Sequence, residues 1–279
     1  MTHAFTVDVE EWFDGIPVGR EIKARMEPRL HVGMTSLLEL MDARAVRGTF
    51  FFLGPVARDN ASLLKRLAAG GHEIGCHGWS HDPLYTMSPE RFREETAQAR
   101  DVIEQITGEP VRSYRAAYWS VTELSLWALD ELAGLGFRCD SSIFPVKNWR
   151  YGIAGFSREP RWIETRSGPI LEVPASVCRL FGQNVPVSGG AYFRIYPYAL
   201  TRSNFVRAEH RGQPVVFYLH PWELDPMHPR LPFDWRARAT HYFNLPSTRP
   251  RLAALLSHFQ FAPLRDMDLS NVPAASLPI

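Results

Sequence analysis

Residues 48–77 read GTFFFLGPVARDNASLLKRLAAGGHEIGCH, and this stretch decides the fold. The apolar run at 48–53 predicts a buried strand, and the apolar spacing at 61–69 predicts a helix that Gly70 and Gly71 end. Residues 73–76 predict a second strand that runs directly into His77. A strand, a helix and a strand in this order indicate two parallel strands with a right-handed crossover.

The same alternation continues on both sides of this stretch. Strands are expected at 4–9, 113–115, 136–139 and 215–219. Helices are expected at 34–43, at 89–106 behind the N-cap Ser88, and at 123–135 behind the N-cap Thr122. Strands that alternate with helices favour an α/β fold, here a barrel with its site where the strands end.

Length and composition favour one domain over residues 1–279, because 45% of the residues are hydrophobic. A stretch rich in Pro, Gly, Arg and aromatic residues, about 144–214, is expected to be a long insertion beside the site. Residues of about 221–270 are expected to form a C-terminal extension with a helix at 249–259, and 270–279 a loose tail.

Charge and targeting signals exclude several classes of partner. With 31 Lys and Arg against 30 Asp and Glu, the chain has no basic block that would indicate nucleic-acid binding. Three cysteines do not make a disulfide framework and favour a reducing compartment. No signal peptide and no apolar run of about 20 residues is recognisable. We therefore expect a cytoplasmic protein, with attachment to a machine at the inner membrane left open, and the oligomeric state is not indicated.

Residues that can do chemistry follow the expected strands. Asp8, His77, Arg115, Asp140 and His220 each come at or just after the end of one strand. In an α/β barrel these strand ends converge on one face. The five side chains are therefore expected to lie near one another.

His77 and His81 are the expected metal ligands. Four residues separate them, so on a helical turn both imidazoles face the same side and can share one ion. Gly78 follows His77 where the metalloprotease pattern has Glu, so a catalytic base must come from elsewhere.

The acidic run after the first strand supplies that base. In extended chain, Asp8 and Glu10 point to the same side, so one carboxylate can bind the metal while the other takes a proton from water. Two histidines and one acid leave a coordination position open, as a catalytic zinc requires.

Several motifs occur in one order: TVDVE at 6–10, TFF at 49–51, HGWSH at 77–81, RAAY at 115–118 and LH at 219–220. In these the chain resembles the polysaccharide deacetylases of carbohydrate esterase family 4, the nodulation-factor deacetylase group. The stretches YRAAYWS, CDSSIFP, SGGAYFR, YLHPWELDP and HYFNL resemble a subgroup that accompanies bacterial exopolysaccharide and exosortase systems. The resemblance spans about residues 4–268 and implies a distorted (β/α) barrel of the seven-stranded type.

The resemblance implies a division of roles at the metal. Asp8 is the expected catalytic base, and Glu10, His77 and His81 are the expected ligands of a divalent metal, with Zn²⁺ as the first candidate. Arg115 is expected to pair with Asp8 and keep it ionised. The second acid of the family motif is usually an adjacent Asp, so Glu11 stays open as the ligand in place of Glu10.

The resemblance also implies an oxyanion donor and a general acid. The backbone N–H of Tyr118 is expected to stabilise the oxyanion, and His220 to protonate the leaving amine, with Asp140 as its orienting partner. Gly78 replaces the family's Ser or Thr, which removes a hydroxyl, and Ala117 replaces Pro.

The implied reaction is hydrolysis of an N-acetyl group on a hexosamine of a polysaccharide or lipid-linked oligosaccharide. Candidate substrate contacts are Asp140, Trp149, Tyr192 and Trp222, since aromatic faces suit sugar rings. Two alternatives remain: a metal-dependent amidase or deformylase acting on a small amide or aminosugar, and a carbohydrate-binding relative without turnover.

Overall fold

A sheet of parallel strands forms the centre of the molecule. The computed structural model describes residues 1–279 except 17, 149, 232–234, 268–271 and 276–279. Seven neighbouring parallel strands run in the order β10-β1-β2-β3-β4-β5-β7. Their bounds are β1 Thr2–Val9, β2 Thr49–Phe52, β3 Glu73–Cys76, β4 Ser113–Tyr114, β5 Cys139–Asp140, β7 Gly168–Glu172 and β10 Val216–Leu219. The expected α/β class is therefore confirmed, although in the described residues no strand pair joins β7 to β10.

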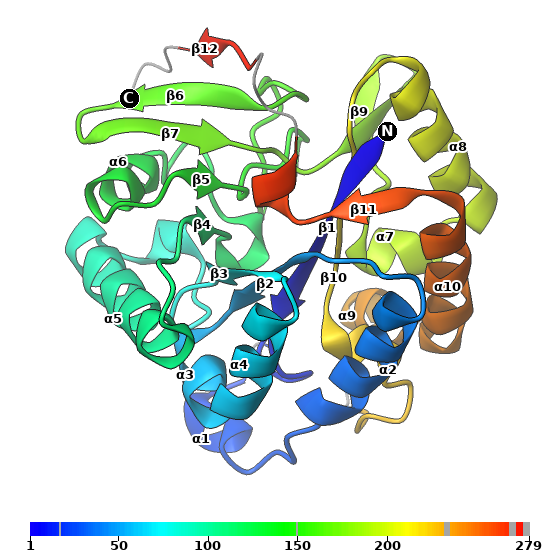
Figure 1. Cartoon of the computed structure of the whole chain (residues 1–279), viewed down its shortest axis with the longest axis horizontal. Helices are drawn as coiled ribbons and strands as arrows, with labels where there is room; N and C mark the ends of the chain where they lie inside the picture. Colours follow the sequence, from blue (N-terminus) through cyan, green and yellow to red (C-terminus); the bar gives the residue numbers. More distant parts are fainter. Residues whose placement is uncertain (17, 149, 232–234, 268–271, 276–279) are drawn as a thin grey trace.

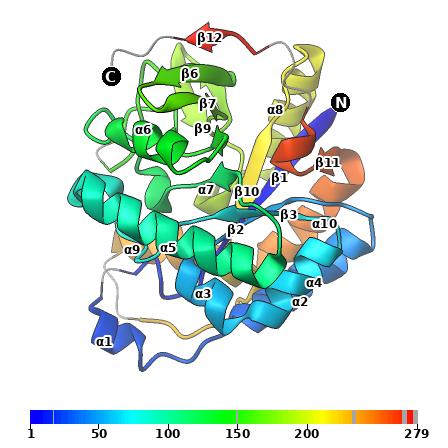
Figure 2. The same ribbon diagram turned by 60° about the vertical axis from the view of Figure 1, so that its left-hand side comes forward.

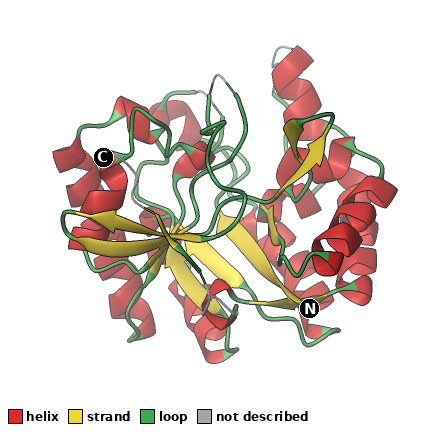
Figure 3. Cartoon of the chain, turned by 90° about the horizontal axis from the view of Figure 1, so that it is seen from above, coloured by secondary structure: helices red, strands yellow, loops and turns green. Residues whose placement is uncertain are grey.

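Helices surround these strands. In Figure 1, α6, α5, α3, α4, α2 and α10 follow one another around the outside of the sheet, and Figures 2 and 3 show the same arrangement from two further directions. The helices are α1 Arg20–Lys23, α2 Leu30–Asp42, α3 Gly54–Asp59, α4 Ala61–Ala69, α5 Pro89–Thr107, α6 Trp127–Gly134, α7 Gly190–Ile195, α8 Tyr198–His210, α9 Trp235–Tyr242 and α10 Thr248–His258. Five 3₁₀ helices are described: η1 Leu84–Thr86, η2 Ala117–Trp119, η3 Pro221–Leu224, η4 Leu245–Ser247 and η5 Leu264–Asp266. None of the described helices is long and apolar enough to cross a membrane.

Both faces of the sheet are buried, which explains its apolar runs. Phe50 and Phe52 of β2 belong to the large core beneath the helices. Phe51, between them, packs on the other face in a smaller cluster that includes Leu264 of η5. Side chains alternate along a strand, so a strand covered on both sides reads as a continuous apolar run.

Most elements fall where the sequence predicts them. β3 and α4 have the predicted bounds, and the Ser88 hydroxyl caps α5 by accepting a hydrogen bond from Arg91 N at 3.3 Å. The helix expected from 123 begins only at Trp127. The Ser125 hydroxyl accepts from Thr122 N and donates to the Ser120 carbonyl oxygen, and this turn replaces the expected cap.

The region expected to be an insertion instead extends the sheet in part. β6 (Arg161–Thr165) pairs antiparallel with β7, and β12 (Ala274–Ala275), within the expected tail, pairs with β6. Residues 270, 271 and 276–279 of that tail lie outside the described residues. β8 (Val177–Leu180) and β9 (Gln183–Pro186) form a separate hairpin, and β11 (Gln260–Ala262) pairs with β1.

Candidate active site

Four of the five expected strand-end residues meet at one edge of the sheet. The register of β1 and β10 places Asp8 beside His220. β3 and β4 end level with each other, which places His77 beside Arg115. All four side chains are buried or nearly so, with His220 the most exposed at 20%.

Glu10, His77 and His81 form a group that fits a metal ion. Their nearest ligand atoms lie within 4.8 Å of one another. His77 Nδ1 lies 2.7 Å from the Arg115 carbonyl oxygen and His81 Nδ1 lies 3.3 Å from that of Asp14. Hydrogen bonds from Nδ1 to these carbonyls leave each Nε2 with a free lone pair, which is the form in which histidine binds metals.

The electrostatics of this group also suit a cation. Burial is the main cause that lowers the pKa of His77, to about 4, so its ring is neutral. Burial lowers the pKa of His81 as well, but Glu10 outweighs burial and leaves the pKa raised. Glu10 Oε2 is buried 2.7 Å from His81 Nε2 without a hydrogen bond of good geometry to any described residue. A buried carboxylate oxygen next to two imidazole nitrogens is the donor set of a three-ligand zinc site.

The two histidines do not lie on a helical turn, contrary to the expectation. They belong to an irregular loop after β3, in which His81 has φ +57° and Gly78 has φ +84°. A residue with a side chain rarely adopts a positive φ, which gives a physical reason for glycine at position 78. Tyr118 also has a positive φ, of +56°, and strained backbone is typical of functional sites.

The hydrogen bonds show that Glu10 and Glu11 have different roles. Both carboxylate oxygens of Glu11 accept hydrogen bonds from the backbone N–H groups of Arg29 and Leu30, at 2.9 and 3.2 Å. These donors lie at the start of α2, where N–H groups lack partners within the helix. Glu11 therefore caps α2, and Glu10 is the acid that faces the histidines.

Asp8 is held by Arg115. The guanidinium Nη1 lies 3.2 and 3.4 Å from the two oxygens of Asp8, and Nη2 donates to Thr6 and Ser141. Arg115 is fully buried, with its guanidinium carbon 3.8 Å from the ring centre of Trp119. The buried guanidinium therefore holds the Asp8 carboxylate in place beside His220.

His220 is oriented by Glu223, which is not among the site residues expected from the sequence. Glu223 Oε1 lies 2.9 Å from His220 Nδ1 and accepts from His220 N at 3.0 Å. His220 Nε2 lies 3.8 Å from an oxygen of Asp8 and 3.8 Å from an oxygen of Glu10. Burial lowers the pKa of His220, but the neighbouring carboxylates outweigh it and raise the pKa to about 9.

Arg194 in turn holds Glu223. Its Nε donates to Glu223 Oε2 at 2.7 Å, and its other nitrogens donate to the carbonyls of Thr240, His241 and Phe243. Burial raises the pKa of Glu223, but Arg194 and His220 together lower it to about 2. The side chain of Arg194 is itself fully buried.

The expectation that Asp140 orients His220 is also wrong. Ser141, directly after β5, lies beside Arg115 and accepts its hydrogen bond at 3.0 Å. Adjacent residues of a strand face opposite ways, so Asp140 points away from that side. Its carboxylate accepts from Ser142 Oγ at 2.5 Å and lies beside Glu172, and burial raises its pKa.

A cavity of about 290 Å³ opens over the histidines and acids. Of the expected substrate contacts, Tyr192 and Trp222 line it, Asp140 does not, and Trp149 lies outside the described residues. Trp222 Nε1 donates to Glu10 Oε1 at 3.1 Å, and its ring stacks on His220. The wall is largely aromatic and includes Tyr118, Trp119, Tyr151, Tyr192, Tyr218 and Trp222.

Comparisons with known proteins find similarity to polysaccharide deacetylases. The family model "Polysaccharide deacetylase" matches residues 27–137, and "Domain of unknown function (DUF3473)" matches 141–268. A chitin deacetylase of Pestalotiopsis is 31% identical over 141 residues, 46% of each chain. A peptidoglycan-N-acetylglucosamine deacetylase of Bacillus cereus is 28% identical over 96 residues, 34% of this chain and 35% of the relative.

A solved structure resembles the whole chain. A candidate polysaccharide deacetylase from Mycobacterium smegmatis, 22% identical, has a TM-score of 0.68 over 99% of this chain and 93% of its own. The two chains thus share one α/β fold. Residues 27–137 are thus similar to polysaccharide deacetylases in sequence. The chain spans about half the length, or less, of the curated relatives it matches.

Proposed function

We propose that this chain is a metal-dependent hydrolase that removes N-acetyl groups from hexosamine units of a bacterial exopolysaccharide or its lipid-linked precursor. The observation that carries the proposal is one arrangement: a group of Glu10, His77 and His81 that fits a metal, with Asp8 and His220 beside it. The aromatic cavity above them suits a sugar ring. The exopolysaccharide substrate rests on the sequence motifs alone.

Glu10, His77 and His81 would hold the cation, with Zn²⁺ as the first candidate because two imidazoles and a carboxylate suit it. A divalent cation in this position supplies Lewis acidity toward an acetyl carbonyl and toward water. The two backbone carbonyls at the Nδ1 atoms fix the ring orientations before any ion binds.

Asp8 is the base in this proposal. Arg115 orients the carboxylate, so that it can take the proton of the attacking water. His220 presents Nε2 toward the cavity while Glu223 fixes Nδ1, so that it can donate a proton to the departing nitrogen. The backbone N–H of Tyr118, in its left-handed turn, is the proposed donor to the developing oxyanion.

The test combines metal analysis with acetate release from N-acetylated glycans of different linkage. Asp8→Asn should lose at least a hundredfold in rate and keep its metal, because general base catalysis contributes about 10²–10⁴-fold. His77→Ala should lose the metal itself, whereas the exposed His31→Ala serves as the control for replacing a histidine. Equal loss of metal in Asp8→Asn and His77→Ala would contradict the assigned roles.

The substrate arms of the same experiment decide between the alternatives. Acetate from oligosaccharides but not from small amides supports the proposal. Hydrolysis of small amides alone would support an amidase, and glycan binding by the metal-loaded protein without acetate release would support a binding protein.

A further inference from the structure

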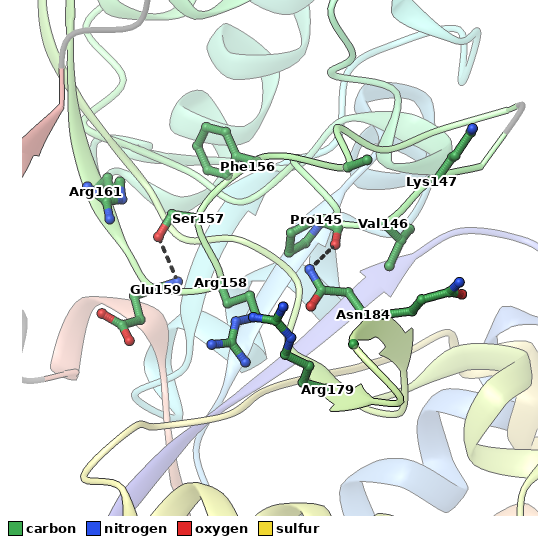
Figure 4. Close-up of a pocket in the computed structure, with 13 residues that line it drawn as sticks. Pro145, Val146, Lys147, Phe156, Ser157, Arg158, Glu159, Arg161, Arg179 and Asn184 are labelled. Carbon is green, nitrogen blue, oxygen red and sulfur yellow. Dashed lines mark hydrogen bonds between the residues drawn. The ribbon is translucent and has the colours of Figure 1, made fainter.

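A second hollow, away from the candidate active site, is lined by cations. It has a volume of about 640 Å³, and Lys147, Arg158, Arg161 and Arg179 line it. In Figure 4 the side chains of Arg158 and Arg179 reach toward each other across it. Both arginines also line a smaller neighbouring hollow. Arg207, in α8, and Arg211, directly after α8, line this second hollow as well. We call these six side chains the basic cluster.

The basic cluster carries uncompensated charge. Among the residues that line the two hollows, Glu159 is the acid, and it accepts a hydrogen bond from Gln213 Nε2. Within the described part of the chain, no salt bridge is seen for any of the six cations. The whole chain carries a formal charge of only +1, so this surface stands out from a nearly neutral protein. Such a cluster favours an anionic partner.

An exposed apolar tip lies directly beside the basic cluster. The β8–β9 hairpin turns at Phe181 and Gly182, between the paired residues Leu180 and Gln183. Phe181 is 97% exposed and Leu180 is 42% exposed. Gly182 and Gln183, next along the chain, line the basic hollow.

The turn itself disfavours phenylalanine. Phe181 has φ +48° and Gly182 has φ +79°, the conformation of a two-residue hairpin turn that prefers Asn-Gly. A bulky residue with a positive φ is a backbone outlier. Neither the turn nor the core therefore explains Phe181, which points to a role outside the protein.

We propose that the β8–β9 tip and the basic cluster bind an anionic membrane surface. The cations would contact lipid phosphates while Phe181 and Leu180 enter the interface, as peripheral proteins combine basic and apolar side chains. A soluble anion would satisfy the cations but leave Phe181 in water, so the tip favours the membrane. This proposal does not depend on the deacetylase activity.

The experiment is sedimentation of the full chain with vesicles. Phosphatidylcholine vesicles with added phosphatidylglycerol should bind the protein, pure phosphatidylcholine should bind it weakly, and high salt should release it. Each cation near such a surface contributes about fivefold to binding, so Arg158→Gln/Arg179→Gln should weaken it roughly 25-fold. Phe181→Ser should weaken it about tenfold or more.

Matched controls remove other causes. Lys65→Gln/Arg66→Gln on exposed α4 makes the same change in charge, and Leu124→Ser removes an 80% exposed apolar side chain elsewhere. Both controls should bind vesicles like the wild type, and circular dichroism checks that all variants fold. Equal binding to neutral and anionic vesicles, no vesicle binding, or cluster variants that bind like the controls would overturn the proposal. Binding of inorganic diphosphate without vesicle binding would indicate a small-anion site and would overturn it as well.

Discussion

Replacing Gly33 by alanine should destabilise the protein, although the same change stabilises most helices. Gly33 lies inside α2, where alanine is favoured over glycine by about 1 kcal/mol. A Cβ at this position would lie 2.0 Å from the carbonyl oxygen of Pro221 and 2.4 Å from its carbonyl carbon. Both atoms are backbone of η3, which cannot rotate away, so α2 and η3 would have to separate by about 1 Å.

Overpacking of this kind costs about 3 kcal/mol, at the upper end of the usual range, because backbone meets backbone. After the gain in helix propensity, we expect the free energy of unfolding to fall by about 2 kcal/mol and Tm by about 4–8 °C. Urea unfolding and thermal melts followed by circular dichroism measure both. Gly134→Ala in α6 is the control, since its Cβ would meet only the side-chain tips of Arg93 and Ser167, at 3.2 and 3.3 Å. If Gly33→Ala were as stable as the wild type, the close packing of α2 on η3 would be refuted.

Three further predictions concern Glu223, His72 and the metal. Glu223→Gln should lower the free energy of unfolding by about 3 kcal/mol, because it leaves buried Arg194 without its carboxylate; an unchanged stability in urea would contradict this. It should also slow acetate release while metal content stays constant. Burial lowers the pKa of His72 to about 4, so its neutral form stabilises the fold fully above about pH 6.5, and this contribution is lost as the pH falls toward 4. At pH 5 the wild type should have lost about 2 kcal/mol of unfolding free energy through His72. Between pH 7.5 and pH 5, the unfolding free energy of His72→Gln should therefore fall by about 2 kcal/mol less than that of the wild type. Equal falls in the two proteins would refute the assignment. Removal of metal with a chelator should lower Tm by several degrees and added Zn²⁺ should restore it, since a ligand at a hundred times its Kd stabilises by about 2.7 kcal/mol; a Tm insensitive to both would argue against the site.

The sequence predicts local structure best where one pattern decides it. Residues 61–69 have helical apolar spacing and a glycine stop, and α4 has these bounds. The helix α3 was missed because its six residues are too few to show a period, although Pro55 stands at its first turn. The loop at 77–81 was misjudged because Gly78 allows a backbone turn that sequence spacing alone does not indicate.

The candidate site likewise has residues that the sequence predicts and residues that only the fold brings in. Glu10 and His77, which face the metal position, come directly after strands, and strand order places them together without further information. Glu223 could have been found, because it stands three residues after His220, a spacing typical of a side chain that caps its own turn. Arg194 could not, since it stands 29 positions before Glu223 and only the tertiary fold brings the two side chains together.

The candidate site joins two parts of the chain that contribute different chemistry. The segment up to residue 137 provides Asp8, the metal-facing group and Arg115, whereas the segment from 141 provides His220, its partner Glu223 and much of the aromatic wall. The polysaccharide deacetylase model matches within the first segment, and the model of unknown function covers the second. In the proposed reaction, bond cleavage depends on the first segment, while protonation of the leaving group and the shape of the sugar cavity depend on the second. The second segment also carries the basic cluster and the β8–β9 tip, so one segment would determine both substrate choice and membrane contact, and it reaches the metal-facing group through the hydrogen bond from Trp222 to Glu10.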